Sequence, residues 1–355
     1  MPADLDSGIV NALVAALLFG ASVPLAKLLA GEMDPALLAG LLYLGSGTAL
    51  LGFRALHQLL SGETERRESR ITRADLPVLA AAILSGGIVA PLLFVTGLRL
   101  ASGATASLLL NFENVLTALL AWFVFRENFD RRIALGMAAI VAAGALLAWP
   151  GAGRAQGNAW GMLAVVGACL GWAVDNNLTR RISGRDPVHI AAAKGLVAGS
   201  VNIGIGLFHG AALPHYAGIA GALAVGAAGY GFSLMFYVLA LRRIGAARTG
   251  AYFALAPFVG AGAAIALLQE HPAALFWPAT ALMAIGVWLH LSERHEHGHH
   301  HEALTHDHGH RHDEHHQHAH DFPWDGHEPH AHRHYHPPLS HSHQHYPDLH
   351  HRHRH

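Results

Sequence analysis

The chain has 355 residues, of which 52% are hydrophobic and only 13% are charged, and its formal net charge is −1. An ordinary soluble domain carries about 25% charged residues, so a soluble helical protein is the disfavoured interpretation. The single cysteine, Cys169, excludes an internal disulfide and a cysteine-rich metal site.

Ten apolar stretches of about 20 residues follow one another along the chain, each long enough to cross a hydrocarbon core of about 30 Å. They start near Ile9, Pro35, Leu76, Gly103, Ile133, Ala159, Val188, Tyr216, Ala246 and Ala273. The first stretch lacks a basic segment before it and follows Asp4 and Asp6, so no cleavable signal peptide is expected. We therefore predict a multi-pass, all-α integral membrane protein with ten transmembrane helices.

The positive charges of the connecting loops predict the orientation of these helices. With the N-terminus placed in the cytoplasm, fourteen arginines lie in cytoplasmic segments, and only Lys27, Arg99 and Arg154 lie outside. Cytoplasmic loops of membrane proteins are enriched in Lys and Arg. We expect both termini to be cytoplasmic and the protein to lie in the inner (plasma) membrane.

The two halves of the chain repeat each other. Shifting the sequence by 152 residues brings Asp34-Pro35 onto Asp186-Pro187, and shifting it by 143 brings Glu127 onto Glu270. Five helices per half is an odd number, so the second repeat must enter the membrane from the opposite side. Inverted repeats are a recurrent plan of secondary transporters, with the solute site near the midplane between the halves. The predicted units are two five-helix repeats, 1–152 and 153–292, and a tail, 293–355.

The stretches "ASLLLNFENVLTALLAWFVFREN" (107–128) and "GAYFALAPFVGAGAAIALLQE" (250–270) give this duplicated chain a resemblance to a known family. It resembles the EamA family of the drug/metabolite transporter superfamily over about residues 8–292. The family's usual Glu-Pro or Ala-Pro reads as Ala256-Pro257 in the second copy, whereas Asn114 replaces the proline in the first. The resemblance implies a carrier of amino acids, other metabolites or drugs, without indicating which.

Glu113 lies about eleven residues into its helix, which at about 1.5 Å per residue places it near the midplane. Asn111 and Asn114 flank it. A charge at the centre of a membrane helix costs about 2.5–3.5 kcal/mol, so Glu113 must be paired or in contact with water. It is either a protonated or hydrogen-bonded structural residue, or a site that binds and releases a proton or cation as access alternates.

Three consecutive polar residues, Asp175, Asn176 and Asn177, interrupt the sixth helix, and Lys194 lies at a similar depth in the seventh. Equal depth predicts an ion pair between Asp175 and Lys194. The pair either only ties the two helices together, or the three polar residues line the cytoplasmic side of a cavity. Successive helical residues point about 100° apart, so the second interpretation requires a local unwinding that would offer free carbonyls to the solute.

The tail has a different composition from the rest of the chain, because residues 293–355 hold 25 of the 31 histidines and almost no aliphatic side chains. It cannot form a core and is expected to be disordered without a ligand. Alternating imidazoles suit zinc, nickel, cobalt and copper(II), with binding that weakens in acid. The candidate ligands are His299, His300, His301, His306, His308, His310, His312, His315, His316, His318, His320, His330, His332, His334, His336, His341, His343 and His345.

Other interpretations of the tail are an expression tag, a polycation that charges in acid and a passive solvated segment. Metal binding by the tail does not make metal the cargo, because the tail could equally supply, store or sense metal. The function expected is a secondary transporter of a small polar solute, namely a divalent transition metal or its chelate, or else a metabolite under metal control. The rival is a membrane metal sensor that transports nothing.

No enzymatic motif is present in the membrane part, and no cofactor is expected there. The expected partners are the lipid bilayer and a small-molecule or metal-ion substrate. Nucleic acid is not expected as a partner, and a homodimer stays open.

Overall fold

The computed structural model describes residues 2–61, 71–125, 131–149, 158–182, 185–291, 295–301, 304–310, 330–336 and 339–345. The first half holds α1 (Pro2–Ala30), α2 (Pro35–Ser61), α3 (Leu76–Ala82), the π-helical segment η1 (Ile83–Val89), α4 (Ala90–Leu100), α5 (Gly103–Leu109), α6 (Phe112–Phe125) and α7 (Arg131–Leu147). The second half holds α8 (Ala159–Arg180), α9 (Pro187–Phe208), α10 (Tyr216–Gly226), the π-helical segment η4 (Ala227–Phe232), α11 (Ser233–Phe253), α12 (Ala256–Leu267) and α13 (Phe276–Leu291).

Eight helical segments within these described ranges are long and apolar enough to cross a membrane. They begin at Ser7, Pro35, Leu76, Gly103, Ala159, Pro187, Tyr216 and Arg248. The two remaining predicted segments are α7, with 17 residues, and α13, with 16 residues, near the lower limit of about 17 for a membrane span. The described part of the chain therefore contains all ten predicted helical segments, within a few residues of their predicted starts.

The two Asp-Pro pairs begin equivalent helices, as the repeat predicts. The Asp34 carboxylate accepts a hydrogen bond from the backbone N–H of Ala36 at 2.8 Å, and Asp186 accepts one from Val188 at 2.9 Å. Aspartate at the N-cap satisfies a backbone donor that would otherwise have no partner. Proline at the next position has no N–H to satisfy and has the φ of a helix.

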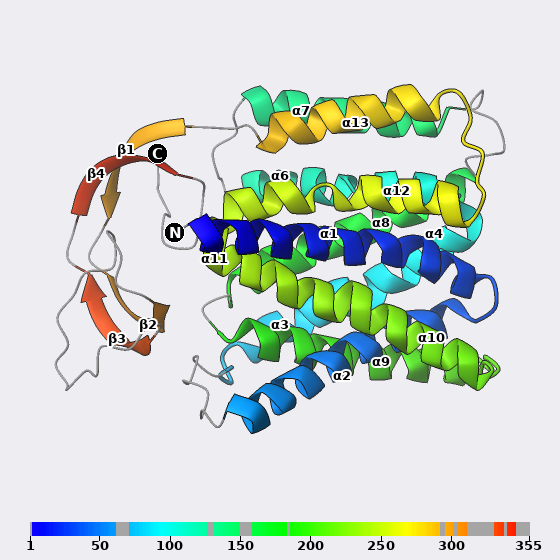
Figure 1. Cartoon of the computed structure of the whole chain (residues 1–355), viewed down its shortest axis with the longest axis horizontal. Helices are drawn as coiled ribbons and strands as arrows, with labels where there is room; N and C mark the ends of the chain where they lie inside the picture. Colours follow the sequence, from blue (N-terminus) through cyan, green and yellow to red (C-terminus); the bar gives the residue numbers. More distant parts are fainter. Residues whose placement is uncertain are drawn as a thin grey trace.

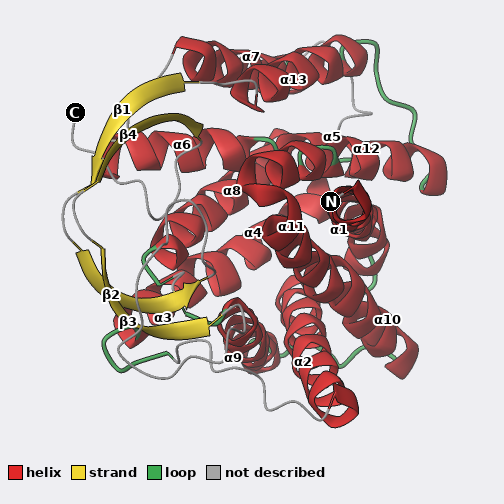
Figure 2. Cartoon of the chain, turned by 60° about the vertical axis from the view of Figure 1, so that its left-hand side comes forward, coloured by secondary structure: helices red, strands yellow, loops and turns green. Residues whose placement is uncertain are grey.

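The contacts between helices have the pattern of a two-fold axis relating the halves. Counterparts from the two halves pack against each other, α2 against α9 and α7 against α13 (Figure 1). The fourth helix also contacts its counterpart, the ninth, through α5 and α12. The contact of α4 with α8 has its equivalent in the contact of α11 with α1. Figure 2 shows α7 and α13 together on one side of the bundle, with α2 and α9 on the opposite side. The fold is thus two inverted five-helix repeats.

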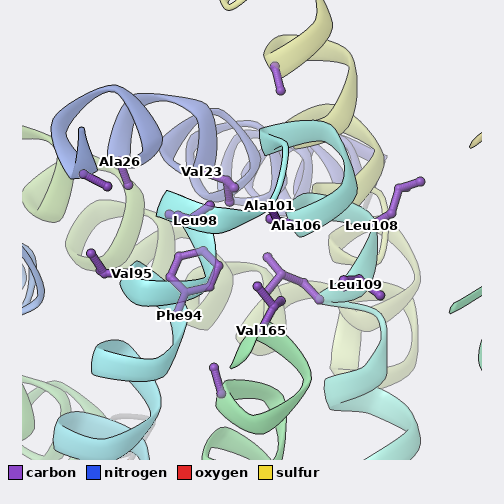
Figure 3. Close-up of a cluster of buried hydrophobic side chains, with 14 of the residues drawn as sticks. Val23, Ala26, Phe94, Val95, Leu98, Ala101, Ala106, Leu108, Leu109 and Val165 are labelled. Carbon is purple, nitrogen blue, oxygen red and sulfur yellow. The ribbon is translucent and has the colours of Figure 1, made fainter. Parts of the chain in front are cut away.

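The largest apolar core lies where helices of both halves meet. Val23 of α1, Phe94 and Leu98 of α4, Leu108 of α5 and Val165 of α8 are all at most 2% exposed (Figure 3). These side chains fill the space between the first half and α8. Their packing holds α5, and through it the start of α6, in a defined position.

Glycines permit the close contact of α2 with α9. A Cβ on Gly40 of α2 would lie 2.8 Å from the carbonyl oxygen of Gly199, and one on Gly199 would lie 2.7 Å from the backbone nitrogen of Leu44. Both distances are too short for a real side chain. Small residues at such interfaces let helix backbones approach each other in a membrane. This contact joins the two halves.

The π-helical segments η1 and η4 occupy equivalent places, each in the third helix of its half. The carbonyl of Gly86 in η1 accepts hydrogen bonds from the Tyr43 hydroxyl at 2.7 Å and from the Trp172 indole N–H at 3.0 Å. The carbonyl of Gly87 accepts one from the Asn202 amide at 2.9 Å. Wide helical turns are frequent at functional sites, and the bonds to η1 tie α2, α8 and α9 to the third helix of the first half.

Two ion pairs cross between the halves at the end of the bundle that the sequence predicts to be cytoplasmic. Arg54 of α2 pairs with Asp186 at the start of α9, and Arg185 contacts Asp75 before α3 at 2.9 Å. Burial raises the pKa of the Asp186 carboxyl, but its hydrogen bonds with Arg54 and with the His189 N–H outweigh burial and hold the pKa below its usual value. Asp75 likewise has a lowered pKa, because hydrogen bonds from Thr72 and the charge of Arg185 outweigh its burial.

Four segments of the tail are described, and each is a β-strand. Strand β1 (His295–His301) pairs antiparallel with β4 (Leu339–His345), and β2 (Leu304–His310) pairs with β3 (His330–His336). The disorder expected of the tail as a whole stays a prediction. Its alternating residues have the two-residue period of a strand, and an antiparallel ladder satisfies backbone groups without needing an apolar core.

We predict that Gly199→Ala destabilises the fold whereas Gly204→Ala on the same helix does not. The first methyl would meet the backbone of α2, while nothing lies within 4 Å of the second. Overpacking of this kind costs about 1–3 kcal/mol of the free energy of unfolding, and replacing an unhindered helical glycine stabilises by up to about 1 kcal/mol. Thermal unfolding in detergent, followed by the reactivity of the buried thiol of Cys169, measures both. Equal melting temperatures would contradict this packing.

We predict that Asp186→Asn lowers stability in a pH-dependent way. Asparagine retains an oxygen for the N-cap but loses the charge that faces Arg54. Because the pKa of Asp186 is lowered in the folded chain, its ion pair stabilises the fold above the unfolded-state value of about 3.9. This contribution is lost as the pH falls through the lowered pKa.

The melting temperature of the original chain should therefore exceed that of Asp186→Asn at pH 7, and the difference should shrink toward about pH 3. Asp34→Asn is the matched control, since Asp34 caps the equivalent helix and no described ion pair involves it. A difference that is independent of pH would contradict the stabilising role of the pair with Arg54.

Candidate functional site

The fourth and ninth helices are both interrupted near their middle, at positions that the repeat makes equivalent. Leu110 and Asn111 separate α5 from α6, and Ala254 and Leu255 separate α11 from α12. Asn111 is fully buried, and its amide donates to the carbonyl of Leu108 at 2.9 Å. Such local bonds from asparagine compete with regular helix hydrogen bonding. Broken helices of this kind often form the solute site of secondary transporters.

A cavity of about 170 Å³ lies beside the two breaks. Its lining comes from both halves and consists of Phe19, Leu110, Glu113, Asn114, Ile140, Tyr237, Gly250, Phe253, Ala254, Ala256, Pro257 and Val287. Glu113, the second residue of α6, is the one charged side chain among these described lining residues. The cavity therefore combines a single carboxylate with mostly apolar walls.

The three consecutive polar residues of α8 form hydrogen bonds with α9, with α6 and with α8 itself. Asp175 pairs with Lys194 on α9, with both carboxylate oxygens 2.6 Å from the ammonium nitrogen. Asn176 donates to Glu113 Oε1 at 2.7 Å. Asn177 donates to the carbonyl of Ala173 one turn earlier at 2.9 Å. The predicted ion pair is confirmed.

The local unwinding that the cavity-lining interpretation requires is not found, because α8 is continuous from Ala159 to Arg180. Each of the three side chains finds its partner in the direction in which a regular helix already points it. The irregular backbone lies instead at Leu110 and Asn111, in the fourth helix.

The Asp175–Lys194 pair lies apart from the described lining of the cavity. The side chains are 8% and 17% exposed, and the Thr179 hydroxyl donates to Asp175 Oδ1 at 2.8 Å. A Cβ on Gly86 of η1 would overlap the Asp175 carboxylate, so the pair packs directly against the first half. Its charges are matched within the protein, which suits a positioning role rather than contact with a solute.

The predicted membrane residues thus separate into two groups. Glu113 and Asn114 line the cavity, and Asn176 reaches it through its bond to Glu113. Asp175, Asn177, Lys194 and Asn111 bind other parts of the protein.

Three aromatic residues of the lining, Phe19, Tyr237 and Phe253, were not predicted. In an apolar helix an aromatic residue in a cavity wall has the same sequence pattern as one that packs in the core. The repeat could have drawn attention to Phe253, since a shift of 143 residues places it on Leu110 beside the other break.

Within the described residues, no group of three or more His, Cys, Asp or Glu side chains is arranged to hold a metal ion. The predicted histidines His312, His315, His316, His318 and His320 lie outside the described residues. For the other predicted tail histidines, the structure describes the backbone alone. The proposed metal ligands of the tail therefore remain a prediction.

Comparison with known proteins matches residues 6–149 and 159–292 to the EamA-like transporter family, once in each half. A protein of Methanothermobacter thermautotrophicus, described as an uncharacterized transporter, is 30% identical over 298 residues, which cover 79% of this chain and 85% of that protein. A solved crystal structure, described only as that of a protein, superposes with a TM-score of 0.57 at 19% identity. It covers 79% of this chain and 95% of its own, and this likeness concerns the fold alone. The chain belongs to the EamA-like transporter family.

Proposed function

We propose that the protein is a secondary transporter that moves a small polar solute through the cavity beside Glu113. The observation that carries this proposal is the position of Glu113 at the break of the fourth helix. Its carboxylate faces a cavity lined by both halves and accepts a hydrogen bond from Asn176 of the opposite half. A rocking motion of one half against the other changes that bond and the access to the cavity together.

Glu113 is the proposed site of proton or cation exchange. Its side chain is half-buried, and within the described residues it has no ion-pair partner. A carboxylate without a cationic partner favours binding of a proton or a cationic solute when it is shielded from water. The bond from Asn176 would hold the empty carboxylate in place between turnovers.

The proposed orientation places both termini in the cytoplasm of the inner membrane, as the distribution of arginines favours. The tail would then meet cytoplasmic metal. We propose that it binds nickel, cobalt, zinc or copper(II), since neutral imidazole suits these ions. The strand register supports this, because His297 lies opposite His343, and His306 lies opposite His334. A homodimer is a further proposal.

Two cargoes fit a cavity with one carboxylate and one amide. If the cargo is a hydrated divalent metal or its chelate, the tail would bind the metal ion and supply it for transport. A metabolite would instead be carried under control of metal bound to the tail. The described cavity favours the metabolite, since transition metals are held by several N, O or S ligands and no described group of three or more such residues is present. A non-transporting metal sensor is the rival from another class.

We expect Glu113→Gln to abolish transport and a chain ending at Ser292 to retain it in a form that no longer responds to metal. Cells producing the full chain, either variant or no protein would be compared at equal membrane expression. Total nickel, cobalt, zinc and copper and a profile of small metabolites are measured. The cellular amount of the transported species should change at least about tenfold less with Glu113→Gln than with the full chain.

If one metal shifts beyond the capacity of the tail and Glu113→Gln removes the shift, that metal or its chelate is the cargo. If only a metabolite shifts, the tail is the regulator. If the protein is instead a metal sensor, Glu113→Gln should retain full function and the chain without the tail should have none.

We expect Lys194→Met to lower stability, whereas Glu113→Gln lowers transport alone. Removing one partner leaves Asp175 buried without a cation, which costs about 3–5 kcal/mol. Adding Asp175→Asn to Lys194→Met removes the unpaired charge and should restore part of the melting temperature. A Lys194→Met variant that unfolds like the original chain but fails in transport would place this pair in the solute path instead.

A further inference from the structure

We propose that the cavity beside Glu113 binds a monovalent organic cation, an alkylammonium or quaternary ammonium compound, between the carboxylate and three aromatic rings. This inference rests on the proposed function in one respect, namely that this cavity holds the transported solute. It names the chemical class of that solute.

The aromatic residues of the cavity form a continuous row. The ring centroids of Phe19 and Phe253 are 5.6 Å apart, and those of Phe253 and Tyr237 are 4.9 Å apart. The row continues from Phe19 to Tyr230 at 5.8 Å and from there to Tyr43 at 5.9 Å. The first three rings line the cavity and come from α1 and α11. Aromatic faces attract cations, and such cages are used to recognise quaternary ammonium groups.

The charge of the cavity favours a single positive charge in the ligand. Glu113 is the only charged residue in the described lining, and Asn114 adds an uncharged amide. The nearby Lys194 is paired with Asp175, so it does not neutralise Glu113. An anionic solute would face an unpaired carboxylate. A bare divalent metal would find too few ligand atoms, because it needs several oxygen or nitrogen donors.

The size and polarity of the cavity fit a small amphipathic cation. Its volume is about 170 Å³, and Leu110, Ile140, Pro257 and Val287 supply apolar contacts. An alkylammonium group is weakly hydrated compared with a metal ion and can bury its methyl groups against such walls. The carboxylate then balances the charge of the ligand, and the faces of the aromatic rings contact the ammonium group.

A matched pair of ligands tests this inference. Choline and 3,3-dimethylbutan-1-ol have the same shape and differ in charge. Binding of both to the purified full-length protein in detergent is measured by calorimetry, with tetramethylammonium and tetraethylammonium as further cations. We expect at least one cation to bind, and choline to bind at least about tenfold more tightly than the alcohol, because only choline interacts with Glu113 and the ring faces.

Two variants and a control locate the binding. Glu113→Gln and Phe253→Leu should each weaken binding of the cation by about threefold to thirtyfold, the range of a desolvated cation–π or charge contact. Phe123→Leu on α6 is the control, because Phe123 is 69% exposed on the outside of the bundle. It should leave binding unchanged. Retained melting temperatures show that the variants are folded.

Three outcomes overturn the inference: no binding of any of the three cations, equal binding of choline and the alcohol, or equal effects of Phe253→Leu and Phe123→Leu. The proposed function survives each of them if Glu113→Gln still abolishes transport in cells. It fails independently if Glu113→Gln transports like the original chain, whatever the cavity binds.

Discussion

Backbone hydrogen bonding without water is the constraint on which this structure depends. In the hydrocarbon core every N–H and C=O must find a partner within the protein. At several described places where the helices deviate from regularity, a side chain supplies that partner. Glu270 accepts from the N–H groups of Gly103 and Ala104 at the start of α5. Lys27 donates to the carbonyls of Leu98 and Ala101 at the preceding turn, both at 2.7 Å.

Many polar residues of the membrane part therefore serve the irregular backbone rather than the solute. Tyr43, Trp172 and Asn202 bind the carbonyls of η1, and Asn111 binds within the break of the fourth helix. The bond of Asn111 lies directly before the start of α6, beside the cavity. Glu113 can then present its carboxylate there while its own helix continues from the break to Phe125.

Duplication supplied the architecture, but the two copies differ in chemistry. The equivalent of Asn111, Glu113 and Asn114 in the second half is Ala254, Ala256 and Pro257, under a shift of 143 residues. One break therefore carries a carboxylate and amides, and the other carries small apolar groups and a proline. The described lining of the cavity therefore carries one charged side chain instead of two equivalent ones.

Hydropathy, the repeat and the Asp-Pro pairs determined the ten helical segments and their grouping into halves, because burial in lipid imposes length and composition on each segment separately. The resemblance of residues 107–128 and 250–270 indicated the family. Equal depth also predicted the Asp175–Lys194 pair correctly. Only the tertiary structure decided which polar residues reach the cavity. Asn176 bonds to Glu113 while its neighbours Asp175 and Asn177 point elsewhere, and the break lies at Asn111 rather than in α8. These outcomes depend on contacts between helices distant in sequence, which the spacing along one helix does not specify.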